Sequence, residues 1–334
     1  MKRDRPNTIL TNRMKAAVHT KYGAPEVVKT MEVPKPIPKK NEVLVKVYAS
    51  TVNRTDSGFR SAEYFVSRFW SGLFRPKYKT LGCEFAGVVE EIGSEVTNFK
   101  LNDKVFGYND ETFGGHAEFL TIDENKAIVT MPDNVTFEEA APILEGGHYA
   151  LSNIRAAKIN SGQNAMVYGA TGAIGTAAVQ LLKYFGVSVT AICNTKNVEL
   201  VKMLGADTVV DYQTQDFTQT EQKYHFIFDA VGKSSFKVCK PLLTDKGIYV
   251  STELGKNAEN VFLALFTPLF KGRKVIFPIP AIDKQVVLFF KQLVAEGKYK
   301  PVIDRKYPLE QIVEAYKYVE TGQKTGNVVL KVVK

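Results

Sequence analysis

The chain has 334 residues, of which 45% are hydrophobic and 24% are charged, a composition typical of globular proteins and not of disordered or fibrous ones. Ordinary domains hold about 100 to 200 residues, so this length predicts two domains. The formal net charge of +9 would suit an anionic ligand such as a phosphorylated cofactor, but the basic residues are scattered, which argues against a nucleic-acid partner. No apolar run approaches the ~18 residues of a membrane helix, so no membrane association is expected.

Thiol and imidazole side chains are few. Three cysteines contain no Cys-x-x-Cys pair, and none of the four histidines lies at a metal-ligand spacing from another. This pattern predicts a protein of a reducing compartment, taken as the cytoplasm, that binds no transition metal. Residues 1–13 are polar and partly basic and lack the apolar segment of a secretory signal, so we expect a flexible leader there.

The predicted elements fall into two regions along the chain. Residues 14–131 are rich in strands, of which 42–48 and 84–92 are the clearest, and the glycines and prolines between them indicate a compact antiparallel domain. Beyond residue 132, strands alternate with helices, which favours a doubly wound parallel sheet. The helices are expected at 137–157, 176–185, 197–204 and 234–243, and the strands at 165–168, 187–192, 208–210, 226–229, 248–251 and 275–278. Helices at 283–296 and 309–320 and a strand at 327–332 follow, and their packing is not decided by the pattern.

A glycine-rich turn joins the strand at 165–168 to the next helix. Its residues are Gly169, Ala170, Thr171, Gly172, Ala173, Ile174 and Gly175. Glycine permits a positive φ and lets backbone amides approach a pyrophosphate, which then lies at the positive end of the helix dipole. The alternative, glycines needed only for a tight turn, is disfavoured because strand, turn, helix and second strand occur in the right order. A dinucleotide cofactor is therefore predicted.

The residues after the second strand predict which dinucleotide binds. An NAD site places a carboxylate about 20 residues after the glycine turn, where it accepts from the ribose 2′-hydroxyl. This chain has Asn194, Thr195 and Lys196 there, and the next acidic residue is Glu199. Two polar donors and a positive charge suit a 2′-phosphate, so NADPH is favoured, unless Lys196 is only a solvated surface residue.

These motifs together resemble the medium-chain dehydrogenase/reductase superfamily, over the chain from Met14 onward. The matching segments, in the family's order, are Lys15-Ala-Ala-Val18, Asn53-Arg-Thr-Asp56, Leu81-Gly-Cys-Glu-Phe-Ala-Gly87, Gly114-Gly-His-Ala-Glu-Phe119, the glycine turn, Leu204-Gly-Ala-Asp207, Asp229-Ala-Val-Gly232 and Gly326-Asn-Val-Val-Leu330. The resemblance implies an α/β fold in which a GroES-like catalytic domain, residues 14–135 and 284–334, is interrupted by a Rossmann domain, residues 136–283. It also implies a cofactor between the domains and a homodimer that pairs edge strands such as 275–278.

The resemblance further implies a reductase without zinc. Zinc-dependent relatives carry a cysteine where this chain has Asn53, a histidine where it has Cys83, and another cysteine near Gly146 or Gly147. A catalytic zinc needs about three protein ligands, which are not available here. Without a Lewis acid, the suited reaction is hydride transfer from NADPH to a quinone or α,β-unsaturated carbonyl, a small apolar substrate whose π system spreads the developing charge.

Several side chains receive roles by this resemblance. Asn53 is expected to donate to the substrate carbonyl, while Asp56 is expected to fix its loop more than to act as an acid. His148, beside Glu145 in a departure from the family's pattern, is either the proton donor or a structural histidine. The remaining cofactor contacts are expected at Tyr212, Val231, Gly232, Leu254, Gly255 and Asn327, where Tyr212 is alternatively a core aromatic. Tyr64, Phe65 and Trp70 either cover an apolar substrate or form a small core under their loop.

Two other functions stay open at this point. One is a zinc alcohol dehydrogenase, which the missing ligands disfavour. The other is a protein that binds NADPH without catalysis and serves as an RNA-binding or partner-binding protein, since some relatives do so. Metal analysis and the salt dependence of binding would separate these from the reductase.

Overall fold

The computed structural model describes residues 12–63 and 68–333, and within them the chain forms two compact units. Unit 1 comprises the described residues of Met1–Leu144, Ile282–Gln292 and Ile303–Lys334, and unit 2 comprises Glu145–Ala281 and Leu293–Val302. By their contacts, residues 136–144 and 282–283 group with unit 1 and residues 293–302 with unit 2, whereas the domains that the resemblance implies divide at 135/136 and 283/284. Among the described residues, no helix combines the length and apolar character that a bilayer crossing requires.

Unit 1 is built on a seven-stranded sheet in the order β14-β15-β3-β4-β5-β7, with β6 also paired to β3. Every pairing is antiparallel except that of β14 with β15. The strands are β3 (Glu42–Val52), β4 (Glu84–Ile92), β5 (Lys104–Tyr108), β6 (Phe119–Asp123), β7 (Ile128–Thr130), β14 (Ile303–Pro308) and β15 (Asn327–Lys331). Side chains alternate between the two faces of β3, so Val43, Val45 and Val47 point to the same face and pack with Phe85 and Leu120 in one apolar cluster.

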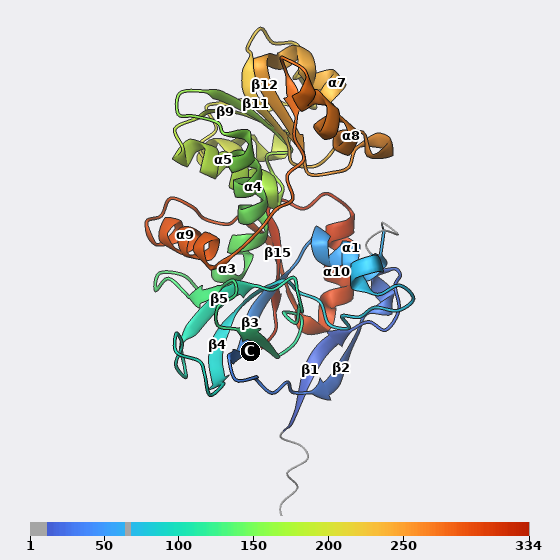
Figure 1. Cartoon of the computed structure of the whole chain (residues 1–334), viewed down its shortest axis with the longest axis vertical. Coiled ribbons are helices and arrows are strands. Elements are labelled where there is room, and N and C mark those ends of the chain that lie inside the picture. The colour runs from blue at the N-terminus through green and yellow to red at the C-terminus, as the bar shows by residue number, and fades with distance from the viewer. Residues whose placement is uncertain (1–11, 64–67, 334) are drawn as a thin grey trace, which may run out of the picture. The chain divides into compact units, whose positions relative to one another are not determined.

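A separate ribbon of β1 (Arg13–Val18) and β2 (Lys29–Pro34) completes the strands of unit 1 (Figure 1). The helices are α1 (Arg54–Ser61), α2 (Arg68–Ser71), α3 (Phe137–Ala140), α10 (Ile312–Glu320) and most of α9 (Lys284–Ala295), whose residues from Leu293 belong to unit 2. Short 3-10 turns are η2 (Pro25–Val27), η4 (Ala141–Ile143) and η9 (Leu309–Gln311). α10 is amphipathic, and its Ile312, Tyr316 and Val319 pack with Val52 and Val328 of the sheet. The C-terminal segment is thus part of the first unit's core.

Unit 2 holds a six-stranded, fully parallel sheet in the order β10-β9-β8-β11-β12-β13. The strands are β8 (Asn164–Tyr168), β9 (Ser188–Cys193), β10 (Thr208–Asp211), β11 (Tyr224–Asp229), β12 (Leu243–Ser251) and β13 (Lys274–Val275). This order is that of a doubly wound dinucleotide-binding domain, and it reverses between β8 and β11, the usual ligand position. The predicted parallel sheet is confirmed.

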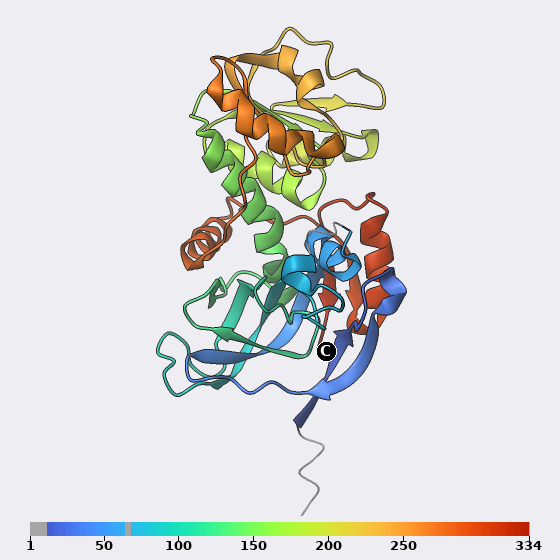
Figure 2. The ribbon, with the colours of Figure 1, turned by 45° about the vertical axis from the view of Figure 1, so that its right-hand side comes forward.

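The helices of unit 2 pack beside this sheet (Figures 1 and 2). They are α4 (Leu144–Ala157), α5 (Ala173–Tyr184), α6 (Val198–Met203), α7 (Phe236–Cys239) and α8 (Glu259–Phe266), with 3-10 turns η5 (Thr195–Asn197), η6 (Lys240–Leu242), η7 (Lys256–Ala258) and η8 (Thr267–Leu269). α5 contacts β8 and β9, whereas α7 contacts β12 and α8 contacts β13. Phe236 of α7 and Leu263 of α8 join Ile227 and Tyr249 in one apolar cluster.

Three local expectations were wrong, and prolines explain two of them. Pro142 leaves helical geometry at φ −83° and ψ 16°, so the helix predicted at 137–157 is divided. Pro241 leaves only a 3-10 turn after Cys239 in the helix expected at 234–243. β13 ends at Val275, short of the predicted 278, although the Ile276 amide still donates to the Tyr249 carbonyl at 3.1 Å. Helix α8 was not predicted at all.

Candidate active site

The glycine turn of unit 2 divides its glycines between two tasks. Gly169 has φ 76°, and a Cβ on Gly175 would lie 2.1 Å from the Gly169 carbonyl oxygen, so these two glycines close the turn. Gly172 is different, because an added Cβ would meet nothing nearer than 4.0 Å. It is the N-cap of α5 and provides no side-chain hydrogen bond to the first turn. The turn therefore leaves open space at a helix N-terminus, where amides attract an anion.

The segment after β9 contains the three residues expected near an adenosine 2′-phosphate. The side-chain oxygen of Asn194 accepts a hydrogen bond from the side-chain NH₂ group of Asn197 at 2.7 Å, and Lys196 is exposed. Thr195 is engaged in a way that we did not predict, because its hydroxyl donates to the Asp211 carboxylate at 2.5 Å. Sequence reasoning missed Asp211, which comes from β10 and lies in register with Cys193 at the end of β9. Parallel pairing of the second and third strands is the signal that would have found it.

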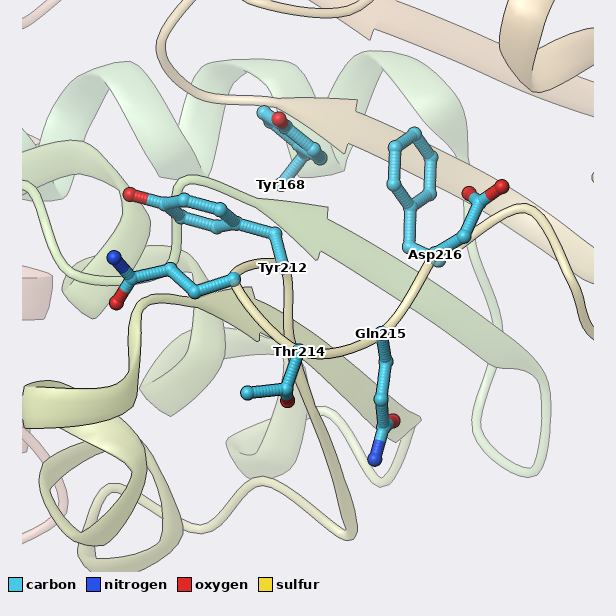
Figure 3. Close-up of a pocket in the computed structure, with 7 residues that line it drawn as sticks. Tyr168, Tyr212, Thr214, Gln215 and Asp216 are labelled. Carbon is cyan, nitrogen blue, oxygen red and sulfur yellow. The ribbon is translucent and has the colours of Figure 1, made fainter.

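Tyr212 follows β10 and is half exposed, which excludes a core aromatic. Its backbone amide donates to the Cys193 carbonyl at 3.0 Å, so it is held at the same sheet edge. An open hollow of about 480 Å³ begins here, lined by Tyr168 and residues 212–217. Figure 3 shows the Tyr212 ring on the side of Tyr168, while Thr214 and Gln215 point away from it. The hollow offers aromatic surface beside the predicted adenosine segment.

The turns after β11 and β12 carry the next predicted contacts. The buried Asp229 carboxylate accepts from the backbone amides of Val231, Lys233 and Ser234, and burial raises the pKa of this carboxyl group despite those bonds. This network fixes Val231, whose side chain would meet a Cβ on Gly169 at 2.6 Å. The segment of Leu254 and Gly255 follows β12, with Gly255 at φ 76°. These turns and the glycine turn lie at the carboxyl ends of neighbouring strands of unit 2.

Asn53 and Asp56 form a capping box at the start of α1 in unit 1. The Asn53 side chain accepts from the Asp56 amide at 2.9 Å, and Asp56 accepts from the Asn53 amide at 3.2 Å and from Gly82 at 2.9 Å. Asp56 is fully buried, and burial raises the pKa of its carboxyl group to about 7. Because backbone amides engage both carboxylate oxygens, the geometry fits the expected loop-fixing role of Asp56.

His116 lies against this pair, and its charge state follows from burial. Burial lowers the pKa of the His116 imidazole to about 4, so the ring is neutral at ordinary pH. Its Nε2 lies 2.7 Å from the Thr51 carbonyl and 3.7 Å from the Asp56 carboxylate, and its Nδ1 lies 3.4 Å from the Tyr316 hydroxyl. Nε2 is the protonated nitrogen, since a carbonyl only accepts. The Asp56 carboxylate therefore has no cationic imidazole beside it.

The donor set of unit 1 does not fit a catalytic zinc. The side-chain nitrogen of Asn53 donates a hydrogen bond to Cys83 Sγ at 3.1 Å. A zinc site needs about three basic ligands, whereas this position offers one thiol and an amide N–H that cannot bind a metal. Within residues 12–63 and 68–333, no three cysteine, histidine or acidic side chains cluster as a metal site would require. We derive no step through zinc, and its absence from the protein stays a prediction.

The other predicted residues are placed as follows. His148 is buried in α4 of unit 2 and packs edge-on against Tyr149 at 4.6 Å, while Asn327 is buried at the start of β15 in unit 1. Gly146 is required beside the start of α5, because a Cβ there would lie 2.5 Å from the Ala173 carbonyl oxygen. Tyr64 and Phe65 lie outside the described residues, as does the side chain of Trp70, so their substrate role stays a prediction.

Comparison with known proteins identifies the class. The alcohol dehydrogenase GroES-like domain matches residues 39–133 and the zinc-binding dehydrogenase family matches residues 204–330. The chain is 32% identical to the chloroplast envelope quinone oxidoreductase homolog of Arabidopsis thaliana, over 95% of this chain and 98% of that one. It is 29% identical to the NADPH-dependent alkenal/one oxidoreductase of the same plant, over 96% and 80%. A solved quinone oxidoreductase from Coxiella burnetii superposes with a TM-score of 0.85 at 26% identity, covering 96% of this chain and 100% of that one.

A GroES-like unit, a Rossmann unit and these relatives define an oxidoreductase of the kind that uses nicotinamide cofactors. The chain belongs to the medium-chain dehydrogenase/reductase superfamily, in its quinone-oxidoreductase-like branch. The predicted family and fold class are confirmed.

Proposed function

We propose that this chain reduces a quinone or an α,β-unsaturated carbonyl with NADPH and without zinc. The observation that carries the proposal is the Asn53–Cys83 pair, which puts an amide donor where zinc relatives place metal ligands. The space beside Gly172, at the start of α5 in unit 2, is open for a nucleotide. The names of the Arabidopsis relatives, a quinone oxidoreductase homolog and an NADPH-dependent alkenal/one oxidoreductase, support this substrate and cofactor class.

The residues of the chain would bind and orient the reactants. When bound, the reduced nicotinamide supplies the hydride. The α5 N-terminus behind Gly172 would hold the pyrophosphate, and Lys196 would face the 2′-phosphate. The side-chain NH₂ group of Asn53 has a second, longer contact, 3.5 Å to the Thr51 hydroxyl oxygen. The N–H of that contact would donate a hydrogen bond to a substrate carbonyl oxygen as negative charge develops there.

Proton delivery is the less defined part of the proposal. Asp56 is held by backbone amides and serves as a positioning residue for Asn53 through their capping box. His148 remains the candidate proton donor, with a structural role as the alternative. Placement in the cytoplasm also stays a proposal, and the three buried cysteine thiols suit a reducing compartment.

A homodimer is part of the proposal. α8 and η8 expose Phe262, Leu265, Phe266 and Leu269, a concentration of apolar side chains that marks an interaction surface. β13 is the last strand of its sheet, and no strand among the described residues pairs with its outer edge. An open edge beside an apolar helix suits a second copy of the chain.

The test begins with metal analysis and fluorescence titration of the purified protein with NADPH and NADH. Absorbance of the nicotinamide is then followed with a quinone and with an enone. We expect no stoichiometric zinc, tighter binding of NADPH, turnover that depends on the acceptor, and loss of the NADPH preference in Lys196→Glu. Stoichiometric zinc with alcohol oxidation would overturn the proposal, and nucleotide binding without turnover on any acceptor would favour a binding protein.

A further inference from the structure

Asp211 lies beside the segment that the proposed function assigns to the cofactor's 2′-phosphate. It ends β10 in register with Cys193, the last residue of β9, so its carboxylate lies next to the turn that begins at Asn194. Thr195 donates to one carboxylate oxygen at 2.5 Å, and the Gln213 backbone amide donates to the other at 3.0 Å. Two turns from neighbouring strands are therefore joined through one carboxylate.

Gln213 adds a second link between the turn after β10 and Thr195. Its side-chain oxygen accepts from the Thr195 backbone amide at 3.2 Å and lies 3.0 Å from the Thr195 hydroxyl. The hydrogen bond from Thr195 is the largest influence on Asp211 and lowers the pKa of its carboxyl group, so Asp211 is charged at neutral pH. The negative charge is thus a fixed feature of the turn after β9.

This arrangement changes what the turn can offer a nucleotide. A threonine hydroxyl has one proton, and here that proton is directed at a carboxylate and not outward to a phosphate. A 2′-phosphate at this turn would meet a like charge, whereas a ribose 2′-hydroxyl could donate to the Asp211 carboxylate, as it does to the acidic residue of an NAD site. Lys196 on the same turn acts in the opposite direction, because it attracts the phosphate.

We propose that Asp211 is a specificity-determining residue that limits the preference for NADPH, so that the chain also uses NADH. The inference rests on the proposed function, since it concerns the same cofactor site. Glu199, the acidic residue nearest in sequence, does not take this role. Its side chain is 80% exposed and pairs with Lys202 at 2.9 Å on α6, so it is not joined to the Asn194–Lys196 turn.

The experiment measures the dissociation constants of NADPH and NADH for the full chain by nucleotide fluorescence. The variants are Asp211→Asn and Asp211→Ser, with Glu199→Gln as a control that removes one negative charge from the neighbouring helix. The wild type should bind both nucleotides. Both Asp211 variants should shift the ratio of the two constants toward NADPH by about tenfold, the effect of one screened like-charge contact, and Glu199→Gln by less than about twofold.

The outcomes separate the two proposals. If the wild type binds neither nucleotide, the proposed function fails and the role of Asp211 fails with it. If the wild type binds NADPH but the Asp211 variants shift the ratio no more than Glu199→Gln does, only the role of Asp211 is overturned. The role of Asp211 is also overturned if the wild type binds NADPH but shows no measurable NADH binding. The same holds if Asp211→Asn shifts the ratio of dissociation constants but a folded Asp211→Ser protein does not.

Discussion

Gly172→Ala separates nucleotide binding from folding more sharply than any other change in the glycine turn. Gly172 has φ −72° and ψ 172°, an extended conformation that alanine adopts readily, and the added methyl would meet nothing within 4.0 Å. Alanine gains about 0.4 to 1 kcal/mol by restricting the unfolded chain. It loses a similar amount, about 0.5 to 1 kcal/mol, as a poorer N-cap than glycine. The free energy of unfolding should therefore stay within about 1 kcal/mol of the wild type.

The same methyl would stand where the pyrophosphate has to approach the first amides of α5. One lost hydrogen bond to a charged group costs about 1.5 to 3 kcal/mol, so NADPH and NADH should both bind about 10 to 100 times more weakly. Nucleotide fluorescence titration gives the dissociation constants, and thermal unfolding without nucleotide gives the stability. A Gly172→Ala protein that binds both nucleotides like the wild type would refute the assignment of the turn to the pyrophosphate.

Gly175→Ala is the matched contrast in the same turn. Its Cβ would lie 2.1 Å from the Gly169 carbonyl oxygen and 2.8 Å from the Ala170 Cα, and both are backbone atoms that move only with the turn itself. Crowding of this kind costs about 1 to 3 kcal/mol or more, so this variant should be less stable even without nucleotide. Equal stability of the two alanine variants would show that the turn is not closed as the structure describes.

Three further predictions concern pH, metal and assembly. Burial raises the pKa of the Asp56 carboxyl group from its ordinary 3.8 to about 7, and His116 is neutral above pH 5. The stability that protonated Asp56 contributes is therefore full below about pH 4 and is lost as pH rises through 7. Relative to Asp56→Asn, the wild type should lose up to about 1.4 kcal/mol per pH unit between pH 5 and 7 in denaturant titrations, and parallel curves would exclude this. Dialysis against a chelator should change neither the melting temperature nor the rate with a quinone, and a loss restored by zinc would contradict the zinc-free proposal. Phe266→Glu should halve the mass measured by light scattering, whereas an unchanged dimer would place the interface elsewhere.

The sequence predicted those parts of the fold that local patterns specify. The alternating pattern at 42–48 indicated a strand, and the strand, turn and helix around Gly169 to Gly175 indicated a nucleotide-binding unit. Both elements are present. Pro142 and Pro241 interrupt the apolar helical patterns at 137–157 and 234–243, which a pattern of apolar spacing alone does not register. Helix α8 was missed although its exposed Phe262, Leu265 and Phe266 have the i, i+3, i+4 spacing of one apolar helix face.

The candidate site was predictable where its residues are adjacent in sequence. Asn53 and Asp56 are three residues apart, so their capping box is a local motif. Asp211 contacts Thr195 across 16 residues, and Cys83 contacts Asn53 across 30, so neither pair follows from spacing along the chain. Finding them requires the register of paired strands, which a single sequence specifies only weakly.

The position of β15 has a consequence for how the protein is made. β15 lies between β14 and β3, and Val328 to Lys331 pair with residues 49–52, which the ribosome releases almost 280 residues earlier. Unit 2 is complete once Val302 has emerged, whereas residues 49–52 of β3 still lack their partner strand β15 at that time. At about 5 to 20 residues per second, this end of β3 remains unpaired with β15 for many seconds during synthesis. During that interval the nascent first unit is the segment that a chaperone would need to shield.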